Sequence, residues 1–135
     1  MSFGGAALAA LLTASAAASG LGASVDAAAP GQQDYLQLCA GCHGAGGRGD
    51  GPRVETLATH PPDLTQLAAA NGGSFPETLV YQVIDGRRIV RSHGTTTMPV
   101  WGEELARGGA SESDIERRVG ALIGHIESLQ QPLHR

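Results

Sequence analysis

The sequence has no lysine, only two cysteines and two methionines, and five aromatic residues (two Phe, two Tyr, one Trp) among 135 positions. All nine basic residues are therefore arginine, and the formal net charge is −4. A mildly acidic chain without a basic run is a poor match for nucleic-acid binding. The length is that of one domain, which excludes a large or multi-domain enzyme. A core so poor in large apolar side chains needs a disulfide, a metal or a large cofactor to complete it.

The first 29 residues differ in composition from the rest, being almost entirely Ala, Gly, Ser and Leu. An apolar stretch at Phe3–Leu12 is followed by small residues, and Val25–Ala27 and Ala27–Ala29 both fit a signal-peptidase site. We expect residues 1–29 to be a removed signal peptide and residues 30–135 to be the mature domain. No basic residue precedes the apolar stretch, so a disordered Ala-rich leader is the alternative. A membrane anchor is disfavoured because the stretch falls short of the ~20 residues that a span needs.

The mature part is predicted to be all-α, with about four to five short helices joined by Gly- and Pro-rich loops. No stretch shows the alternation that is typical of a strand. Capping residues and glycine stops predict four helices. Two of them are Gln33–Cys39 and Leu64–Ala70, the second capped by Asp63. The third is opened by the capping box Ser74–Glu77, with Pro76 in its first turn, and is stopped after Asp85 by Gly86, and the fourth is Ser113–Leu129.

The last predicted helix carries one apolar stripe, with steps of four, three, four and three residues: Ile115, Val119, Leu122, Ile126 and Leu129. Ser113 and Glu116 form a second capping box at its start. Gly120 and Gly124 lie inside it, and each costs roughly 1 kcal/mol relative to alanine. The cost suggests close approach by another helix, although a chance glycine is equally plausible in a chain with 20 glycines.

Cys39-Ala40-Gly41-Cys42-His43 is the most informative motif, and it contains both cysteines of the chain. The pattern C-x-x-C-H is the attachment signature of c-type haem. Cysteines at this spacing can reach the two vinyl groups on one porphyrin edge, and the next residue is then carried over the ring face. We expect one haem, bound covalently through Cys39 and Cys42, with His43 as an iron ligand.

Three other interpretations of the cysteine pair remain open. A dithiol redox site belongs in a strand–helix–strand setting, which this sequence does not predict. A zinc site needs about four ligands, and no second Cys/His cluster supplies the rest. A structural disulfide across two residues would brace little of the chain.

Met98 is the candidate for the second iron ligand, because Met1 leaves with the leader and no third methionine exists. It lies in a predicted loop from Gly94 to Pro99 rather than on a helix, which is an unusual place for core packing. His/Met ligation produces a centre of raised potential that suits electron transfer. His93 is the competing ligand in the same loop, and the weaker candidates are His60, His125 and His134.

A glycine-rich stretch follows the cysteine motif, and Gly44–Gly49 matches the pattern G-x-G-x-x-G. A dinucleotide site would need a strand before this pattern and a helix after it. Here the cysteine motif precedes it and Pro52 follows shortly, so we reject that interpretation. The glycines are expected to let the backbone wrap the haem edge.

These motifs resemble the class I monohaem cytochromes c over roughly Asp34–Leu129. The resemblance rests on Cys39–His43, Gly49–Pro52, Pro61–Thr65 and Met98–Gly102, in this order and followed by an amphipathic helix. It implies a small cytochrome c fold, in which the first and last helices cross near the haem. It further implies that the carbonyl of Pro62 accepts a hydrogen bond from His43, and that Trp101 lies near a haem propionate. Core packing is the alternative role for Trp101.

The resemblance leans toward bacterial cytochromes that serve terminal oxidases and periplasmic dehydrogenases. The implied function is one-electron transfer in the periplasm, without enzymatic activity or a small-molecule substrate. Expected partners are a dehydrogenase, an oxidase or a cytochrome bc1-type complex. The protein is expected to be soluble, or held at a membrane by a partner. Because lysine is absent, the lysine ring of mitochondrial cytochrome c cannot be carried over.

Two other functions compete with that of a free carrier. The chain could be a subunit fixed to a dehydrogenase or oxidase, or a haem sensor or peroxidase-like enzyme with a labile distal ligand. Charge placement bears on the partner. Arg87, Arg88 and Arg91 form a local basic cluster, whereas the C-terminal part is acidic; this asymmetry is expected to orient a transient complex.

Overall fold

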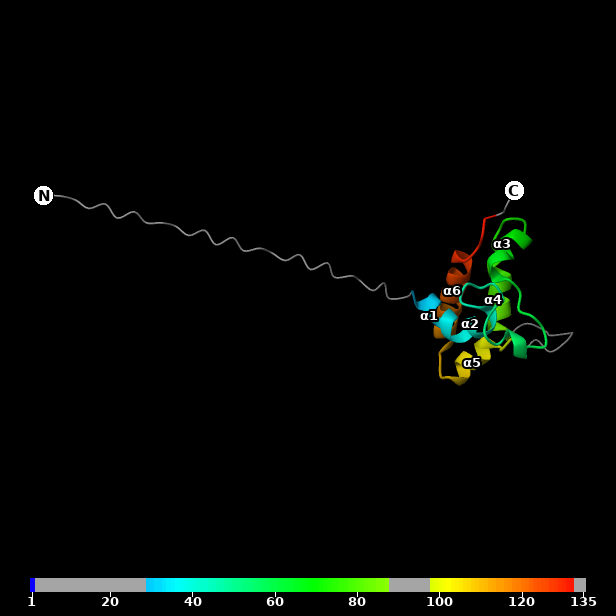
Figure 1. The fold of residues 1–135 in the computed structure, drawn as a ribbon. Coiled ribbons are helices and arrows are strands. Elements are labelled where there is room, and N and C mark those ends of the chain that lie inside the picture. The colour runs from blue at the N-terminus through cyan, green and yellow to red at the C-terminus, as the bar shows by residue number, and fades with distance from the viewer. Residues whose placement is uncertain (2–28, 88–97, 133–135) are drawn as a thin grey trace.

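The computed structural model describes residues 29–87 and 98–132, together with Met1. These residues form short helices and no strand, which confirms the predicted all-α class. The helices run α1 (Pro30–Asp34), a π-helical turn η1 (Tyr35–Cys39), α2 (Ala40–His43), the 3-10 turns η2 (Val54–Thr56) and η3 (Leu64–Gln66), α3 (Leu67–Ala70), α4 (Glu77–Asp85), α5 (Trp101–Arg107) and α6 (Glu112–Ser128). Figure 1 shows them gathered into one body, with α6 against α1 and α4.

The first three helical segments follow one another without a break from Pro30 to His43, so the predicted helix Gln33–Cys39 extends in both directions. Pro30 begins the helix, at a position where its missing N–H costs nothing. The π turn places Tyr35 in full burial, and the Tyr35 hydroxyl donates to the Gly44 carbonyl at 2.8 Å. The helix therefore carries both cysteines and His43 to its C-terminal end.

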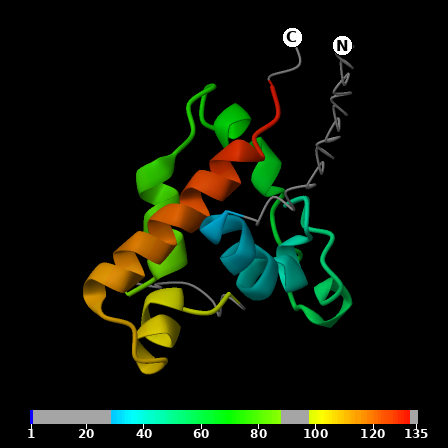
Figure 2. The ribbon, with the colours of Figure 1, turned by 90° about the vertical axis from the view of Figure 1, so that its left-hand side faces the viewer.

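The crossing of α1 and α6 is the tightest helix contact, and Figure 2 shows the two helices against each other. A Cβ on Gly31 would collide with the backbone carbonyl of Ala121. Beside it, the Arg118 guanidinium forms two hydrogen bonds to the Asp34 carboxylate, at 2.7 and 2.8 Å. The glycine that allows the two helices to approach closely is therefore Gly31 on α1, and not a glycine of α6.

The glycines of α6 do not mark a contact. Gly120 and Gly124 are exposed, and a Cβ on either would meet no atom within 4 Å. The start of α6 also differs from the prediction: Ser111, not Ser113, caps it and accepts from the Asp114 N–H at 3.2 Å. The cap lies two residues earlier than predicted, and the helix begins at Glu112, because a serine with extended backbone at 111 precedes it directly.

The apolar stripe of α6 forms the centre of the core. Ile115, Val119, Leu122 and Ile126 are at most 3% exposed, and Leu129 packs against them. The stripe was therefore identified correctly from its spacing. Ile123 is also buried, so the apolar face is wider than the stripe.

The end of α4 was predicted correctly and its start was not. Gly86 adopts a left-handed conformation, with φ of 68°, directly after Asp85. At the other end, Pro76 occupies the capping position and no side chain caps the helix. A capping box at Ser74 would place Glu77 at the third helical position, but Glu77 is the first, so the Ser74 side chain lies too early to cap it.

The segment Leu64–Ala70 is helical, as a 3-10 turn that continues into α3. Asp63 caps it as predicted, because its carboxylate accepts from the Thr65 N–H at 2.9 Å. Helix α5 was not predicted as a separate element. It follows Met98-Pro99-Val100 directly and ends before Gly108, so its seven residues are too few to show a helical apolar period.

Candidate functional site

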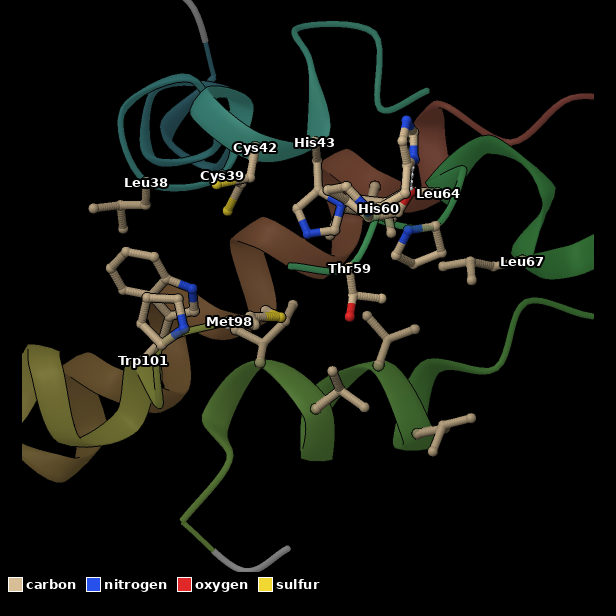
Figure 3. A pocket seen from close by; sticks show the side chains of 18 of the residues that line it. Leu38, Cys39, Cys42, His43, Thr59, His60, Leu64, Leu67, Met98 and Trp101 are labelled. Carbon is tan, nitrogen blue, oxygen red and sulfur yellow. Dashed lines mark hydrogen bonds between the residues drawn. The ribbon is translucent and has the colours of Figure 1, made fainter. Parts of the chain in front are cut away.

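A single cavity of about 590 Å³ brings the six predicted site residues together. Figure 3 shows the cavity between the end of α2, helix α4 and the start of α5. Its lining includes Cys39, Cys42, His43, Pro62, Met98 and Trp101. These residues span 63 positions of sequence, from 39 to 101, so only the fold places them around one space.

The loop after His43 closes the end of the helix that carries the cysteines. Three successive carbonyls at the helix end accept backbone hydrogen bonds from this loop: Gly41 from Arg53 at 2.9 Å, Cys42 from Gly51 at 3.2 Å and His43 from Gly49 at 2.9 Å. Gly51 has no room for a Cβ, which would meet the Gly41 and Cys42 carbonyls. These glycines let the backbone cover the helix end, whereas the sequence had suggested that they follow the haem edge.

Both cysteines are free thiols beside the cavity, and Figure 3 shows their sulfur atoms at the same wall as Leu38. Burial, reinforced by the nearby Asp34 carboxylate and Cys42, raises the pKa of Cys39 to about 12. Cys39 is therefore a neutral thiol at physiological pH. A dithiol redox site requires a cysteine of lowered pKa, so these surroundings argue against that interpretation.

His43 extends from the end of α2 into the cavity (Figure 3). Burial lowers the pKa of the imidazole, and the Pro62 carbonyl opposes that shift without prevailing. The ring is therefore neutral at pH 7, which is the form that binds a metal. Nδ1 is buried and lies outside hydrogen-bond geometry, although the Pro62 carbonyl is close enough to act on it.

Met98 and Trp101 enter the cavity from the segment that leads into α5. Figure 3 shows the Met98 thioether across the cavity from the His43 ring, with Trp101 beside it. A thioether and an imidazole on facing walls are side chains that could hold a haem iron between them. The competing ligand His93 lies outside the described residues.

The remaining candidate histidines differ in position. His60 lines the cavity, with its Nδ1 at 3.0 Å from the Pro61 carbonyl, on the same side as His43. His125 lies on α6 and packs against Tyr35, with the two rings tilted and their centroids 4.9 Å apart. His134 is outside the described residues. Of the two that the structure describes, His60 lines the cavity and His125 does not, and His60 does not face His43 from the opposite wall.

Helix α4 supplies a wall of the cavity that the sequence analysis did not identify. Val80 and Ile84 are buried, whereas Leu79 and Val83 also line the cavity yet are 56% and 42% exposed. The four residues fall in two adjacent pairs one turn apart, so the helix is apolar over a wider face than one core contact needs. That width was the signal in the sequence that the helix also faces a second apolar surface.

The other interpretations of the cysteines gain no support in the part of the chain that the structure describes. No three His, Cys, Asp or Glu side chains gather there at metal-binding distance, so a zinc site has no further ligands. No strand precedes or follows the cysteine motif. Both thiols are free, so no disulfide joins them.

Arg87, the residue of the predicted basic cluster that the structure describes, is ion-paired. The Arg87 guanidinium bonds Asp85 at 2.7 Å and Glu112 at 2.7 and 2.8 Å, so its charge is compensated. These contacts tie the end of α4 to the start of α6, which is a structural role. Arg88 and Arg91 lie outside the described residues.

The cavity and its residues fit a covalently attached haem. Two thiols stand one helical turn apart at one wall, and an imidazole and a thioether face each other. The His43 ring lines the cavity in its neutral form, which leaves an imidazole nitrogen able to bind a metal. The exposed Leu79 and Val83 side chains are those that a large flat apolar group would cover.

Comparison with known proteins gives one family. Residues 26–109, more than half of the chain, match the family described as cytochrome C oxidase, cbb3-type, subunit III. Neither a curated protein nor a solved structure matches the chain. Within the described residues, no helix is long and apolar enough to cross a membrane.

Proposed function

The chain belongs to the family of cytochrome c oxidase, cbb3-type, subunit III, and from this premise we propose that it is a one-electron carrier with one covalent c-type haem. The observation that carries the proposal is the convergence of Cys39, Cys42, His43 and Met98 on one apolar cavity. Family membership supports c-type haem and electron transfer in general. The ligand set comes from the residues themselves.

The proposed roles divide among four residues. Cys39 and Cys42 hold the haem through thioether bonds, and His43 and Met98 ligate its iron. The haem supplies a site that accepts and releases one electron. With His43 and Met98 both holding the iron, no position would be left open for a substrate, so we assign the protein no catalytic residue of its own.

The residues around the ligands prepare the site for that role. The Pro62 carbonyl orients the His43 ring and increases its electron donation, which is a property of partners behind metal-bound histidines. Leu79, Val80, Val83 and Ile84 on α4 keep water from the cavity. A dry and rigid site needs little rearrangement when its charge changes, which favours rapid electron transfer.

The redox partners are proposed to be a dehydrogenase, an oxidase or a cytochrome bc1-type complex. The family description specifically favours a second candidate role, that of a subunit fixed within an oxidase. The chemistry at His43 and Met98 is the same in both. Copurification from native membranes distinguishes them: a fixed subunit remains with a larger haem protein at high salt, and a free carrier separates.

We also propose that the protein is exported to the periplasm, with residues 1–29 as the signal peptide. Support comes from the apolar stretch and the small residues before Pro30 in the sequence. Mass spectrometry of the protein recovered from a periplasmic extract tests this. A chain that begins after Ala27 or Ala29 is expected, and recovery of residues 1–29 on the haem-loaded protein would contradict it.

An optical spectrum tests the function. The protein is produced with haem-attachment machinery and recorded oxidised, reduced, and reduced under carbon monoxide. We expect a low-spin spectrum with a methionine–iron charge-transfer band and no effect of carbon monoxide. Met98→Ala is expected to lose the band and to bind carbon monoxide, while His60→Ala keeps the wild-type spectrum.

Each other outcome has a defined meaning. Carbon monoxide binding by the wild-type protein would show an open distal position, and the sensor or peroxidase-like function would replace electron transfer. A band that survives in Met98→Ala would exclude Met98 as the ligand. Loss of covalent haem in Cys39→Ala together with Cys42→Ala is expected in either case.

A further inference from the structure

The side chain of Gln130 joins the end of α6 to the turn that follows Pro62. Its Nε2 donates to the Leu64 carbonyl at 2.7 Å and to the Ile126 carbonyl at 2.9 Å, and its Oε1 accepts from the Ala68 N–H at 2.9 Å. Figures 1 and 2 show the residues after α6 passing beside α3. One carboxamide thus connects two segments more than 60 residues apart.

The groups that Gln130 binds lie at or near helix ends, and the Ile126 carbonyl also accepts from the Leu129 N–H at 3.1 Å. Ile126 lies in the last turn of α6, and Ala68 lies in the first turn of α3. Carbonyls at a helix end and N–H groups at a helix start need an external partner. Gln130 supplies such partners through both hydrogens of its Nε2 and through its Oε1, which fixes the orientation of the carboxamide. The Gln131 N–H reinforces the connection by donating to the Thr65 carbonyl at 3.0 Å.

The same turn is held from its other side by the loop that follows the cysteine motif. The Leu64 N–H donates to the Gly47 carbonyl at 2.7 Å. Leu64 is therefore fixed at both of its backbone groups, by Gly47 through its N–H and by Gln130 through its carbonyl. The Leu129 side chain also meets Gly47, so α6, the turn and the loop share one junction.

This turn forms the cavity wall behind His43. Pro61, Pro62 and Leu64 line the cavity, and the Pro62 carbonyl acts on the His43 ring. Leu64 is only two residues from Pro62. The hydrogen bonds of Gln130 therefore restrain, from outside the cavity, the segment that carries the Pro62 carbonyl.

We propose that Gln130 is a positioning residue of the redox site, which sets the approach of the Pro62 carbonyl to the His43 ring. The inference rests on the function proposed above. A closer carbonyl makes the imidazole a stronger electron donor and favours the oxidised state. Loosening the turn is therefore expected to move the Pro62 carbonyl away from the His43 ring and to raise the midpoint potential.

The test compares Gln130→Met with Gln131→Met in the haem-loaded protein. Methionine keeps the length of the side chain and makes none of the three hydrogen bonds, whereas Gln131→Met leaves the main-chain bond to Thr65 in place. Gln130→Met is expected to raise the midpoint potential and to shift the His43 Nδ1 proton resonance upfield in the reduced protein. Gln131→Met is expected to change neither, and both variants keep the Met98 charge-transfer band.

Amide exchange supplies a readout that needs no haem chemistry. The Ala68 N–H is expected to be protected in the wild-type protein and to exchange about fivefold faster or more in Gln130→Met. An unprotected Ala68 N–H in the wild type would overturn the proposal even if Gln130→Met does not fold. The proposal would also be overturned if the Nδ1 resonance and the midpoint potential of Gln130→Met matched those of Gln131→Met. A wild-type protein without a c-type spectrum would instead refute the proposed function itself.

Discussion

At the scale of single residues, burial shifts the pKa of Cys39 and the pKa of His43 in opposite directions. It raises the pKa of the Cys39 thiol to about 12 and lowers the pKa of the His43 imidazole, so both side chains are neutral at pH 7. The common cause is a site of low polarity, which disfavours any charged form. A neutral imidazole has a free electron pair for a metal, so the surroundings that hold His43 also prepare it as a ligand.

His125 provides a pH test away from the cavity. Burial lowers its pKa below the ordinary 6.5, and its Nε2 is buried without a partner beside the Tyr35 ring. The unfolded chain therefore takes up a proton at a pH where the folded chain does not. Stability is unaffected above pH 6.5 and falls as the pH decreases below it. The measurement is Tm between pH 7.5 and 5.

Two variants isolate this contribution. His125→Phe keeps the ring contact with Tyr35 and cannot titrate, so its Tm is expected to fall less steeply with acid than that of the wild type. His125→Gln is expected to show the same shallower slope, although its amide lowers Tm at every pH. Parallel curves for the wild type and both variants would show that His125 does not take part in acid destabilisation.

At the scale of elements, the crossing of α1 and α6 depends on the absence of one side chain. Gly31 lets α1 lie directly on the Ala121 carbonyl, and the Asp34–Arg118 pair fixes the crossing beside it. The end of the same N-terminal helix carries Cys39, Cys42 and His43. The contact at Gly31 therefore fixes the position of the haem-binding motif relative to the core.

Gly31→Ala and Gly120→Ala form a matched pair of substitutions. Gly31→Ala is expected to destabilise the protein by about 1–3 kcal/mol, because its Cβ meets backbone that cannot rotate away. Gly120→Ala, on the exposed face of α6, is expected to stabilise it by about 0.5–1 kcal/mol. Denaturant unfolding measures both. Equal effects of the two substitutions would contradict the close crossing.

The sequence predicted the elements where one local rule decides the structure. The Asp63 cap, the Gly86 stop and the α6 stripe each depend on residues within one or two turns. The sequence failed where a distant neighbour decides. Nothing near Gly31 shows that Ala121 lies against it. The helix starts at Glu77 and Glu112 were also displaced from the expected capping boxes, although the local residues Pro76 and Ser111 set them.

At the scale of the whole molecule, the cavity that Cys39, His43 and Met98 line adjoins the hydrophobic core. Val80, Ile84 and Ile126 belong to the core and also line the cavity of about 590 Å³. The residues with distinctive chemistry at this site could be recognised from the sequence, because cysteine and methionine are so scarce. Leu79 and Val83 were missed, because the wide apolar face of α4 indicates a second apolar surface but not what covers it.

The last prediction follows from that arrangement. Without haem, α4 and the end of α2 face each other across a space that apolar side chains of the chain do not fill, and water must enter it or the walls must collapse. The chain has few large apolar residues to replace that contact, and its glycine-rich loops lose much entropy on ordering. We therefore expect the haem-free protein to be largely unfolded.

Circular dichroism of Cys39→Ala together with Cys42→Ala measures this. Helical signal is expected to be far below that of the loaded wild type, and addition of free haem is expected to restore part of it, because His43 and Met98 remain. Single replacement at Cys39 or Cys42, with one thioether kept, serves as the control and should retain most of the helix. Native helicity in the haem-free double variant would show that α6 and its contacts with α1 stabilise the fold by themselves. The haem would then complete a folded domain, and its attachment would not decide whether the chain folds.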